Sequence, residues 1–319
     1  MKHEFHITAF PKLEYLWYIL FVGVLLFFLM AICGNLLIIV LICLVPHLHT
    51  PMYFFLCNLA AQDVIYVSAI LPKLMSIILT GDHNISFVGC FTQMCMFILC
   101  IGTDIFLLTS MAYDRYVAIC IPLQYSIIMH FKKCCLMALV CWVVGALNAA
   151  LYALLMSQVA FCHIKAINHF FCDIRAILKL STGDITHMKI IIFFESVVLG
   201  CIPFALILIS YLHIIFAIQK IKSTTGRLKT FSGCASHIIT VILFCGASLS
   251  QYINPDTEFK EQDKSLSLLY VAVVPMLNPL VYSLRNKDVL QAMKKLRDFR
   301  WQCASNAFLY YIHFSISTN

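Results

Sequence analysis

Charged residues are scarce in this chain, because aspartate, glutamate, lysine and arginine together make up only 12% of its 319 residues. Soluble globular domains carry about 25% charged residues, which keep their surfaces hydrated. Hydrophobic residues make up 62% of this chain, against roughly 45–50% in such domains. The deficit of charge therefore excludes an ordinary soluble enzyme, a nucleic-acid-binding domain and a disordered chain. It indicates an integral membrane protein.

The sequence also has no low-complexity linker, no internal repeat and no strand-like alternation in its apolar runs. Strands of a membrane β-barrel are segments of about 10 residues that alternate apolar and polar side chains, and the runs here are continuous. The first run follows sixteen mixed residues that have neither a basic n-region nor a small-residue cleavage site. We therefore expect a retained helix there rather than a removed signal peptide.

Cysteine is present sixteen times. This number is below the roughly 8–10% that marks a disulfide scaffold, and most of these cysteines lie in apolar runs, where cysteine behaves as a small hydrophobic residue. Two histidines stand in the string HEFH at 3–6, but the spacing is not that of HExxH and no third ligand is near. We therefore expect no metal site of this kind.

Seven apolar runs are long enough to cross a hydrocarbon core of about 30 Å, which takes about 20 residues in an α-helix. They lie near 17–42, 53–79, 88–121, 135–156, 190–218, 233–253 and 266–284. We therefore predict an all-α membrane protein, a seven-transmembrane helix bundle within residues 17–286.

The basic residues predict the orientation of this bundle. An odd number of spans places the two termini on opposite sides, and with the N-terminus outside, twelve lysines and arginines lie inside against seven outside. This bias favours residues 1–16 as an extracellular N-terminus and residues 301–319 as a cytoplasmic tail. Residues 287–300 have apolar side chains at helical spacing and a basic face, which predicts a short amphipathic helix on the inner leaflet.

Five strings stand at or near the ends of the predicted helices. They are LHTPMYFFLCNLAAQD at 48–63, MAYDRYVAIC at 111–120, SY at 210–211, KTFSGCASH at 229–237 and PMLNPLVYSLRNKDV at 275–289. In this order and at this spacing they resemble the strings of odorant (olfactory) receptors, which are rhodopsin-like G-protein-coupled receptors. The likeness covers roughly residues 20–297, and the PMLNP form is similar to the tetrapod-type class.

The resemblance implies a receptor rather than an enzyme. Such a receptor binds a small volatile odorant within its helix bundle and activates a heterotrimeric stimulatory G protein, which raises cAMP. It spans the plasma membrane several times, with no nucleic-acid partner and no cofactor beyond a bound sodium ion. One alternative is a receptor-derived chain with impaired trafficking or signalling. Another is a seven-helix transporter, which would need half-helices, repeat symmetry or rings of pore-lining charge that this sequence does not display.

Asp114, Arg115 and Tyr116 stand at the inner end of the third predicted helix. A charge there is costly unless it is paired or hydrated, so Arg115 needs Asp114 or a partner protein. The alternative is an arginine that only extends to the membrane surface. The resemblance implies that Arg115 is released when the sixth helix moves outward. It implies roles in activation and G-protein coupling for Asp114, Arg115, Tyr116, Tyr211, Lys229, His237, Asn278, Pro279 and Tyr282.

Four polar residues stand within apolar runs, at Asn35, Asp63, Asp104 and Asn278. Their depth places them near mid-membrane, where such residues face protein or water and pair with one another. The resemblance implies that Asp63, Asp104 and Asn278 surround a hydrated sodium ion. Two adjacent carboxylates need a cation or a shared proton. The alternative is a hydrogen-bonded network with no ion.

Three prolines, Pro203, Pro275 and Pro279, interrupt predicted helices. Proline removes a backbone hydrogen bond and allows a kink. Asn278, Pro279 and Tyr282 belong to the string NPLVY, which matches the NPxxY pattern of the family. A kink beside a polar cluster is a candidate two-state element.

The resemblance places an odorant pocket among the outer halves of the third, fifth, sixth and seventh helices. The matching positions are Phe97, Ile98, Ile101, Gly102, Glu195, Ser196, Leu199, Cys245, Ser248, Leu249, Tyr252, Leu268 and Val271. They are apolar with a few hydroxyl groups, which suits a small volatile ligand. The alternative for part of the set is ordinary helix packing. Cys245 stands in the string FCG, where the family has an aromatic ring.

Glu195 is an acid within an otherwise apolar helix. An intramembrane acid indicates a functional site by default, and a carboxylate that faced the pocket would pair with an amine ligand. The alternative is an acid that faces the outer headgroups or is protonated.

The resemblance also implies a disulfide between Cys90 and Cys172 on the lumenal side. Family members usually have a second bridge in the same loop, but Thr182 replaces its later cysteine and leaves Cys162 unpaired. A free lumenal thiol can mispair. The N-terminal glycosylation sequon of the family is absent. The only sequon, at Asn84, is so near the membrane that we expect poor glycosylation.

Overall fold

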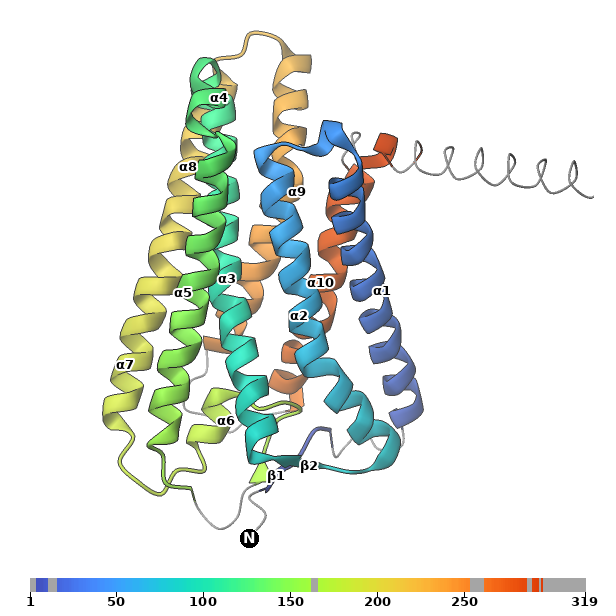
Figure 1. Ribbon diagram of the computed structural model, residues 1–319, viewed down its shortest axis with the longest axis vertical. Helices are drawn as coiled ribbons and strands as arrows, with labels where there is room; N and C mark the ends of the chain where they lie inside the picture. Colours follow the sequence, from blue (N-terminus) through green and yellow to red (C-terminus); the bar gives the residue numbers. More distant parts are fainter. Residues whose placement is uncertain are drawn as a thin grey trace, which may run out of the picture.

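The computed structural model describes residues 4–10, 16–161, 166–252, 261–285, 289–292 and 294. Within these ranges, the side chains at 229, 247–252, 261–262 and 282–285 lie outside the described part. Long helices run side by side along the molecule, and the strands β1 and β2 lie beyond one end of them (Figure 1).

Each predicted apolar run corresponds to one long helix, to within one residue at the ends of the runs 88–121 and 233–253. The helices are α1 (Trp17–Leu44), α2 (Pro51–Thr80), α3 (Phe87–Cys120), α5 (Phe131–Ser157), α7 (Thr186–Ser196) continued by η4 (Val197–Cys201) and α8 (Ile202–Gln219), α9 (Thr224–Tyr252) and α10 (Glu261–Arg285). The short elements are β1 (Glu4–Ile7), η2 (Pro46–Leu48), β2 (Asn84–Ser86), η3 (Pro122–Gln124), α4 (Tyr125–Ile128), β3 (Ala166–Ile167) and α6 (Ile174–Leu178). Seven helices of the described part are long and apolar enough to cross a membrane, which confirms the predicted fold class.

Local signals set the ends of α2 and α3. Helix α2 begins at Pro51, a first position where the missing N–H costs nothing. It ends before Gly81, whose φ of 70° is the left-handed conformation that favours glycine. Ser86 precedes α3, and its hydroxyl oxygen accepts a hydrogen bond from the backbone N–H of Gly89 at 3.0 Å. These residues reduce the number of unsatisfied backbone groups at the ends of α2 and α3.

Helix α3 lies at the centre of the bundle, where it contacts α2, α5, α8 and α9. It approaches α5 closely at Gly102 and Gly145, because a Cβ atom added to Gly145 would collide with α3. The outer surfaces of α1, α5, α7 and α8 instead expose large apolar side chains, among them Tyr18 and Phe193. Lipid would cover these side chains in a membrane.

The prolines of α10 give that helix an unpaired carbonyl group. Pro275 and Pro279 both lie inside α10, and Pro279 has no N–H to donate to the carbonyl oxygen four residues earlier, at Pro275. Nδ2 of Asn35 donates to that oxygen at 2.9 Å. Helix α1 therefore supplies the hydrogen bond that α10 lacks. The third proline, Pro203, lies in the first turn of α8, directly after the π-helical turn η4.

A small sheet lies beyond the helix ends, and no pattern in the sequence predicted it. Its strand order is β2–β1–β3, with β1 antiparallel to β2 and parallel to β3. Phe5 and Ile7 of β1 are buried and alternate with exposed residues. This alternation spans four residues only, and the partner strands are still shorter, so the pattern is too brief to recognise. Residues 4–10 of the N-terminal segment, which was expected to be extracellular, pack onto the bundle.

The predicted amphipathic helix at 287–300 lies mostly outside the described residues. Residues 289–292 and 294 are helical, and Val289 and Ala292, three positions apart, are both buried. This spacing agrees with one apolar helix face. The segment 301–319 lies outside the described residues.

Candidate functional site

Asp114 and Arg115 form an ion pair at the end of α3 opposite the sheet. Nε of Arg115 donates to Oδ2 of Asp114 at 3.0 Å, and Nη2 contacts the same oxygen. The Tyr125 hydroxyl, from α4, donates to Oδ1 of Asp114 at 2.8 Å. Burial and the Asp114 carboxylate raise the pKa of Tyr125, so its hydroxyl keeps the proton that it donates. The fully buried Asp114 carboxylate thus has a partner on each oxygen.

His237 connects α9 to two other helices. Nε2 of His237 lies 3.0 Å from the carbonyl oxygen of Leu108 on α3, and Nδ1 lies 2.6 Å from the Tyr211 hydroxyl on α8. A carbonyl oxygen can only accept, so Nε2 carries the proton and Nδ1 accepts from Tyr211. Ser236 adds a bond from its hydroxyl to the carbonyl oxygen of Val281 on α10, at 3.1 Å. These bonds hold α9 against the bundle.

The other residues expected at this end lie apart from the ion pair or outside the described part. The ring of Tyr116 lies 5.7 Å from the ring of His213 on α8, so Tyr116 packs between α3 and α8. The side chains of Lys229 and Tyr282 are outside the described part. The sequence did not single out Tyr125, because a tyrosine in a short connecting helix carries no signal of its own.

The polar residues expected near mid-membrane form two hydrogen-bonded pairs, through the neighbouring residues Gln62 and Asp63 of α2. Nδ2 of Asn278 donates to Oδ2 of Asp63 at 2.8 Å, and Nε2 of Gln62 donates to Oδ2 of Asp104 at 3.1 Å. Asn35, expected in the same network, donates instead to backbone carbonyl oxygens of α1 and α10. Gln62 was not predicted, although a polar residue beside Asp63 in an apolar run was a signal for it.

Four buried polar atoms around these pairs have no hydrogen-bond partner among the described residues. They are Oε1 of Gln62, Oδ1 of Asp104, Oδ1 of Asn278 and the Tyr66 hydroxyl. Buried polar atoms are normally hydrogen-bonded, and three of these four are acceptor oxygens. The cluster therefore has oxygen atoms to offer to water or to a hard cation. Within the described ranges, no group of three or more histidine, cysteine or acidic side chains could hold a metal ion.

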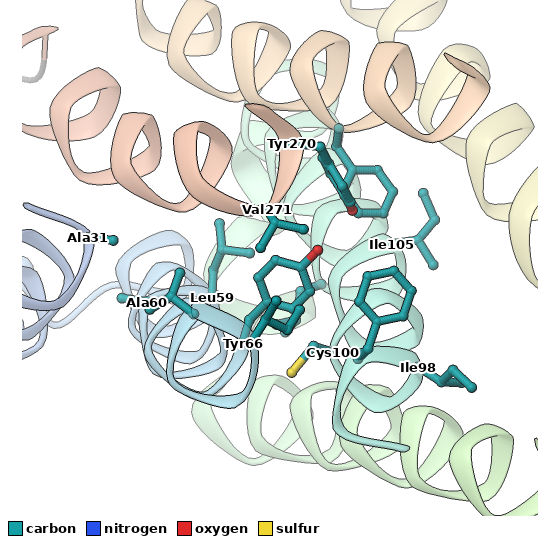
Figure 2. Packing of buried hydrophobic residues seen from close by; sticks show 14 of the residues in the cluster. Ala31, Leu59, Ala60, Tyr66, Ile98, Cys100, Ile105, Tyr270 and Val271 are labelled. Carbon is teal, nitrogen blue, oxygen red and sulfur yellow. The ribbon is translucent and has the colours of Figure 1, made fainter. Parts of the chain in front are cut away.

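Aromatic rings fill the bundle on the sheet side of this cluster. The Tyr66 ring stacks on Phe97 with 5.8 Å between centroids and meets Tyr270 at 6.2 Å. The Phe97 ring in turn contacts the ring of Phe171, which lies in the loop between β3 and α6, with 4.9 Å between centroids. The rings of Phe244 on α9 and Tyr270 on α10 are 6.4 Å apart. Figure 2 shows Tyr66, Tyr270 and Val271 gathered between α2, α3 and α10. Of these rings, the sequence predicted only Phe97.

The predicted pocket positions differ in burial. Phe97, Ile98, Gly102 and Val271 are buried, while five others are half-buried, namely Ile101, Ser196, Leu199, Cys245 and Leu268. The hydroxyl of Ser196 donates to the carbonyl oxygen of Ile192 within its own helix, at 2.8 Å. The side chains of Ser248, Leu249 and Tyr252 lie outside the described part.

Glu195 is half-buried between α7 and α5. The Tyr152 hydroxyl donates to Oε2 of Glu195 at 2.7 Å, and the Asn148 side chain also hydrogen-bonds this carboxylate. Both partners come from α5, one turn apart. Oδ1 of Asn148 is buried and has no partner within the described part. The Glu195 carboxylate is therefore hydrogen-bonded to the neighbouring helix α5, rather than facing only the outer headgroups.

Cys90 and Cys172 form the predicted disulfide, which joins the start of α3 to the loop after β3. Side-chain bonds reinforce this joint. The backbone N–H of Cys172 donates to Oε1 of Gln93 at 2.9 Å, and Nε2 of Gln93 donates to the carbonyl oxygen of Ala69 at 3.0 Å. In the same loop, burial lowers the pKa of His169 to about 4, so its imidazole is neutral.

Two further predictions concern the sheet side of the bundle. Thr182 donates from its backbone N–H to the carbonyl oxygen of Ala160 at 3.0 Å, beside a backbone bridge between Phe161 and Ser181. Backbone pairing thus joins the two loop segments, around Phe161 and around Ser181, in which the family has its second disulfide. Cys162 lies outside the described residues. Asn84 is exposed on β2, with Oδ1 3.5 Å from Nδ1 of His6.

Comparisons with known proteins agree with this arrangement. The sequence model of a family described as "Olfactory receptor" matches residues 24–298. Olfactory receptor 10AG1 of Homo sapiens is 43% identical over 294 residues, which cover 92% of this chain and 98% of that protein. Olfactory receptor 1E16 of Mus musculus is 41% identical over 287 residues, which cover 90% of each chain. This chain, a multi-pass membrane protein and not an enzyme, therefore belongs to the olfactory receptor family of G-protein-coupled receptors.

Proposed function

We propose that this chain binds a small volatile odorant within the helix bundle and then activates a heterotrimeric stimulatory G protein, which raises cAMP. The observation that carries the proposal is the closed set of contacts at the end of α3 opposite the sheet. Arg115 is paired with Asp114, and His237 holds α9 against α3 and α8. Each contact can break without unfolding a helix, as a two-state switch requires.

Activation on this proposal separates α9 from α3 at the end that carries Arg115. Breaking both bonds of His237 would free α9 from α3 and α8, and Arg115 would then leave Asp114 for carbonyl groups of the G protein. A buried ion pair that loses one partner is strongly destabilised, so the released Arg115 favours a bound partner. Asp114 would keep one hydrogen bond, from Tyr125.

The polar cluster between α2, α3 and α10 would link the ligand to this switch. Asp63 and Asn278 lie on α2 and α10, and Asn278 directly precedes Pro279. We propose that a sodium ion or a shared proton balances Asp63 and Asp104, because two adjacent carboxylates do not both ionise cheaply. The unpartnered oxygens of Gln62, Asp104 and Asn278 support this proposal.

The ligand would occupy the apolar region of α3, the α7–α8 helix, α9 and α10. Its walls are apolar with few hydrogen-bonding groups, so binding would rest on burial. At about 25 cal/mol per Å² of apolar surface, a small odorant gains only a few kcal/mol, which corresponds to roughly micromolar or weaker affinity. The relatives named above are olfactory receptors, which supports this class of ligand.

We further propose that the protein lies in the plasma membrane with its N-terminus outside. The disulfide between Cys90 and Cys172 supports this orientation, since disulfides form in oxidising compartments. The end of the bundle opposite the disulfide would then face the cytoplasm and the G protein.

An odorant panel tests the proposal. The chain would be expressed with the trafficking helpers of the family, its surface level measured by staining, and cAMP recorded for each odorant. At least one volatile should raise cAMP in a dose-dependent way, and cells that lack the stimulatory G protein should not respond. A chain that reaches the surface and still responds to no member of a broad panel would contradict the proposal.

A further inference from the structure

Residues 4–10, which we call the strap, lie across the end of the bundle that carries the Cys90–Cys172 disulfide. Phe5, Ile7, Ala9 and Phe10 of the strap are each no more than 3% exposed. Terminal segments are usually poorly ordered unless other contacts tie them down. The burial of the strap therefore points to specific contacts that hold it.

Backbone hydrogen bonds tie the strap to two loops that are far apart in sequence. The N–H of Ile7 donates to the carbonyl oxygen of His83 at 2.9 Å, and the N–H of Thr8 donates to that of Ile167 at 2.8 Å. The imidazole of His83 also lies 2.8 Å from the carbonyl oxygen of Ile7. The strap thus closes the space between the loop after α2 and the loop after α5.

Lys264 provides a separate link, from the first turn of α10. Lys264 is 1% exposed, and its Nζ donates to the carbonyl oxygens of Thr8 and Ala9, both at 2.9 Å. Lysine is almost never fully buried unless it is paired, and burying an ammonium group is costly without strong hydrogen bonds. Two of the groups that make this burial tolerable are carbonyl oxygens of the strap.

A chain of rings leads from the strap to the proposed ligand site. Phe10 stacks on Phe170 with 5.7 Å between centroids, and Phe170 meets Phe171 at 5.0 Å. Phe171 contacts Phe97 of α3 at 4.9 Å. The strap therefore covers the loop that itself rests on Phe97, a predicted pocket position.

We propose that the strap is a lid over the ligand site and that Lys264 is its latch. When Lys264 leaves the carbonyl oxygens of Thr8 and Ala9, the strap lifts and the outer end of the bundle opens to water-borne ligands. That the site under the strap binds a ligand rests on the proposed function. The movement of the strap itself requires neither an odorant nor a G protein.

Cysteine accessibility on the face of α10 that carries Lys264 tests the lid. Ser267 lies three residues after Lys264, on the same face of α10, and is 3% exposed. In the full-length receptor at the cell surface, Ser267→Cys would be exposed to a charged, membrane-impermeant methanethiosulfonate reagent. Mass spectrometry of the peptide that contains residue 267 then gives its labelling rate apart from other cysteines.

Loss of the latch should expose this cysteine. Lys264→Met keeps the length of the side chain and removes its hydrogen-bond donor. Because hydrogen bonds from a charged group are among the stronger ones, the labelling rate of Ser267→Cys should be about tenfold higher than with Lys264 intact. Lys189→Met, at an exposed lysine of α7, is the matched control and should leave the rate unchanged. Equal rates in the two variants would overturn the latch.

A staple gives a second test that does not depend on the folding of Lys264→Met. His6 and Asn84 are exposed cross-strand partners of β1 and β2, so the pair His6→Cys and Asn84→Cys can form a disulfide. With Lys264 intact, the oxidised staple should abolish labelling of Ser267→Cys during the same exposure. Unchanged labelling would show that the strap does not control access. A chain without any odorant response would leave both tests valid.

Discussion

Glu195 is the one acid among the predicted pocket positions, so on the proposed function its chemistry would constrain the ligand. Its carboxylate accepts a hydrogen bond from Tyr152, and Glu195 directly precedes the predicted pocket position Ser196 in the chain. An amine ligand would pair with this carboxylate, and a neutral isostere would leave it unmatched, so the pair carries specificity even where its net stabilisation is small.

We therefore predict that Glu195→Gln weakens responses to amine odorants about tenfold and spares responses to neutral ones, as loss of about 1.4 kcal/mol would do. Glutamine can still accept the bond from Tyr152, so packing is kept. Tyr152→Phe, which removes the neighbouring hydroxyl only, is the control. The measurement is a set of cAMP dose–response curves at equal surface level. Equal loss for both odorant classes, or no loss, would make Glu195 a structural residue.

Helix α10 depends on α1 for one hydrogen bond, and this dependence can be measured. Asn35→Ala would leave the carbonyl oxygen of Pro275 buried without its donor, which costs about 1–3 kcal/mol. Pro279→Ala supplies an N–H that can restore the bond within α10. We predict that Asn35→Ala lowers the melting temperature of the detergent-purified receptor.

The double variant should recover part of this loss. A double-mutant cycle isolates the coupling between the two positions. The account predicts that Asn35→Ala lowers the melting temperature less in the Pro279→Ala background than in the unmodified chain. Strictly additive melting temperatures would mean that Asn35 does not replace the missing bond of Pro279.

Helix α9 is held by His237, so the equilibrium of the switch should respond to this residue. His237→Phe keeps an aromatic ring against Tyr211 and removes the bonds to Leu108 and Tyr211. Two net hydrogen bonds are worth about 1–3 kcal/mol, which would favour the open form. We predict higher cAMP without odorant, with His187→Ala, at an exposed histidine of α7, as the control. Unchanged or lower basal cAMP at equal surface level would contradict this assignment.

At the scale of elements, apolar length alone predicted all seven long helices, but it misjudged their ends. The sixth span was expected from 233, whereas α9 begins at Thr224, because its first turns carry polar residues that hydropathy discounts. Nothing local could predict the strap, since the residues that bury Phe5 and Ile7 come from loops far along the chain.

At the scale of the whole molecule, sequence motifs indicated candidate site residues but not the side chains that contact them. The strings had singled out Asp114, Arg115, Tyr211 and His237, but they predicted neither the contact of His237 with Tyr211 nor its contact with Leu108. Tyr125 and Tyr152 were missed, because each reaches its acid only through tertiary packing. Asn35 was grouped with Asp63 from depth alone, and depth does not tell which way a side chain is directed.

The central claim is that this receptor signals through release of Arg115 from Asp114, and one substitution tests it most directly. Arg115→Ala removes the ion pair and the group proposed to meet the G protein, while it leaves Asp114 its bond from Tyr125. With an odorant that activates the unmodified chain, and at equal surface level, the account predicts loss of the cAMP response. A response as large as that of the unmodified chain would contradict it.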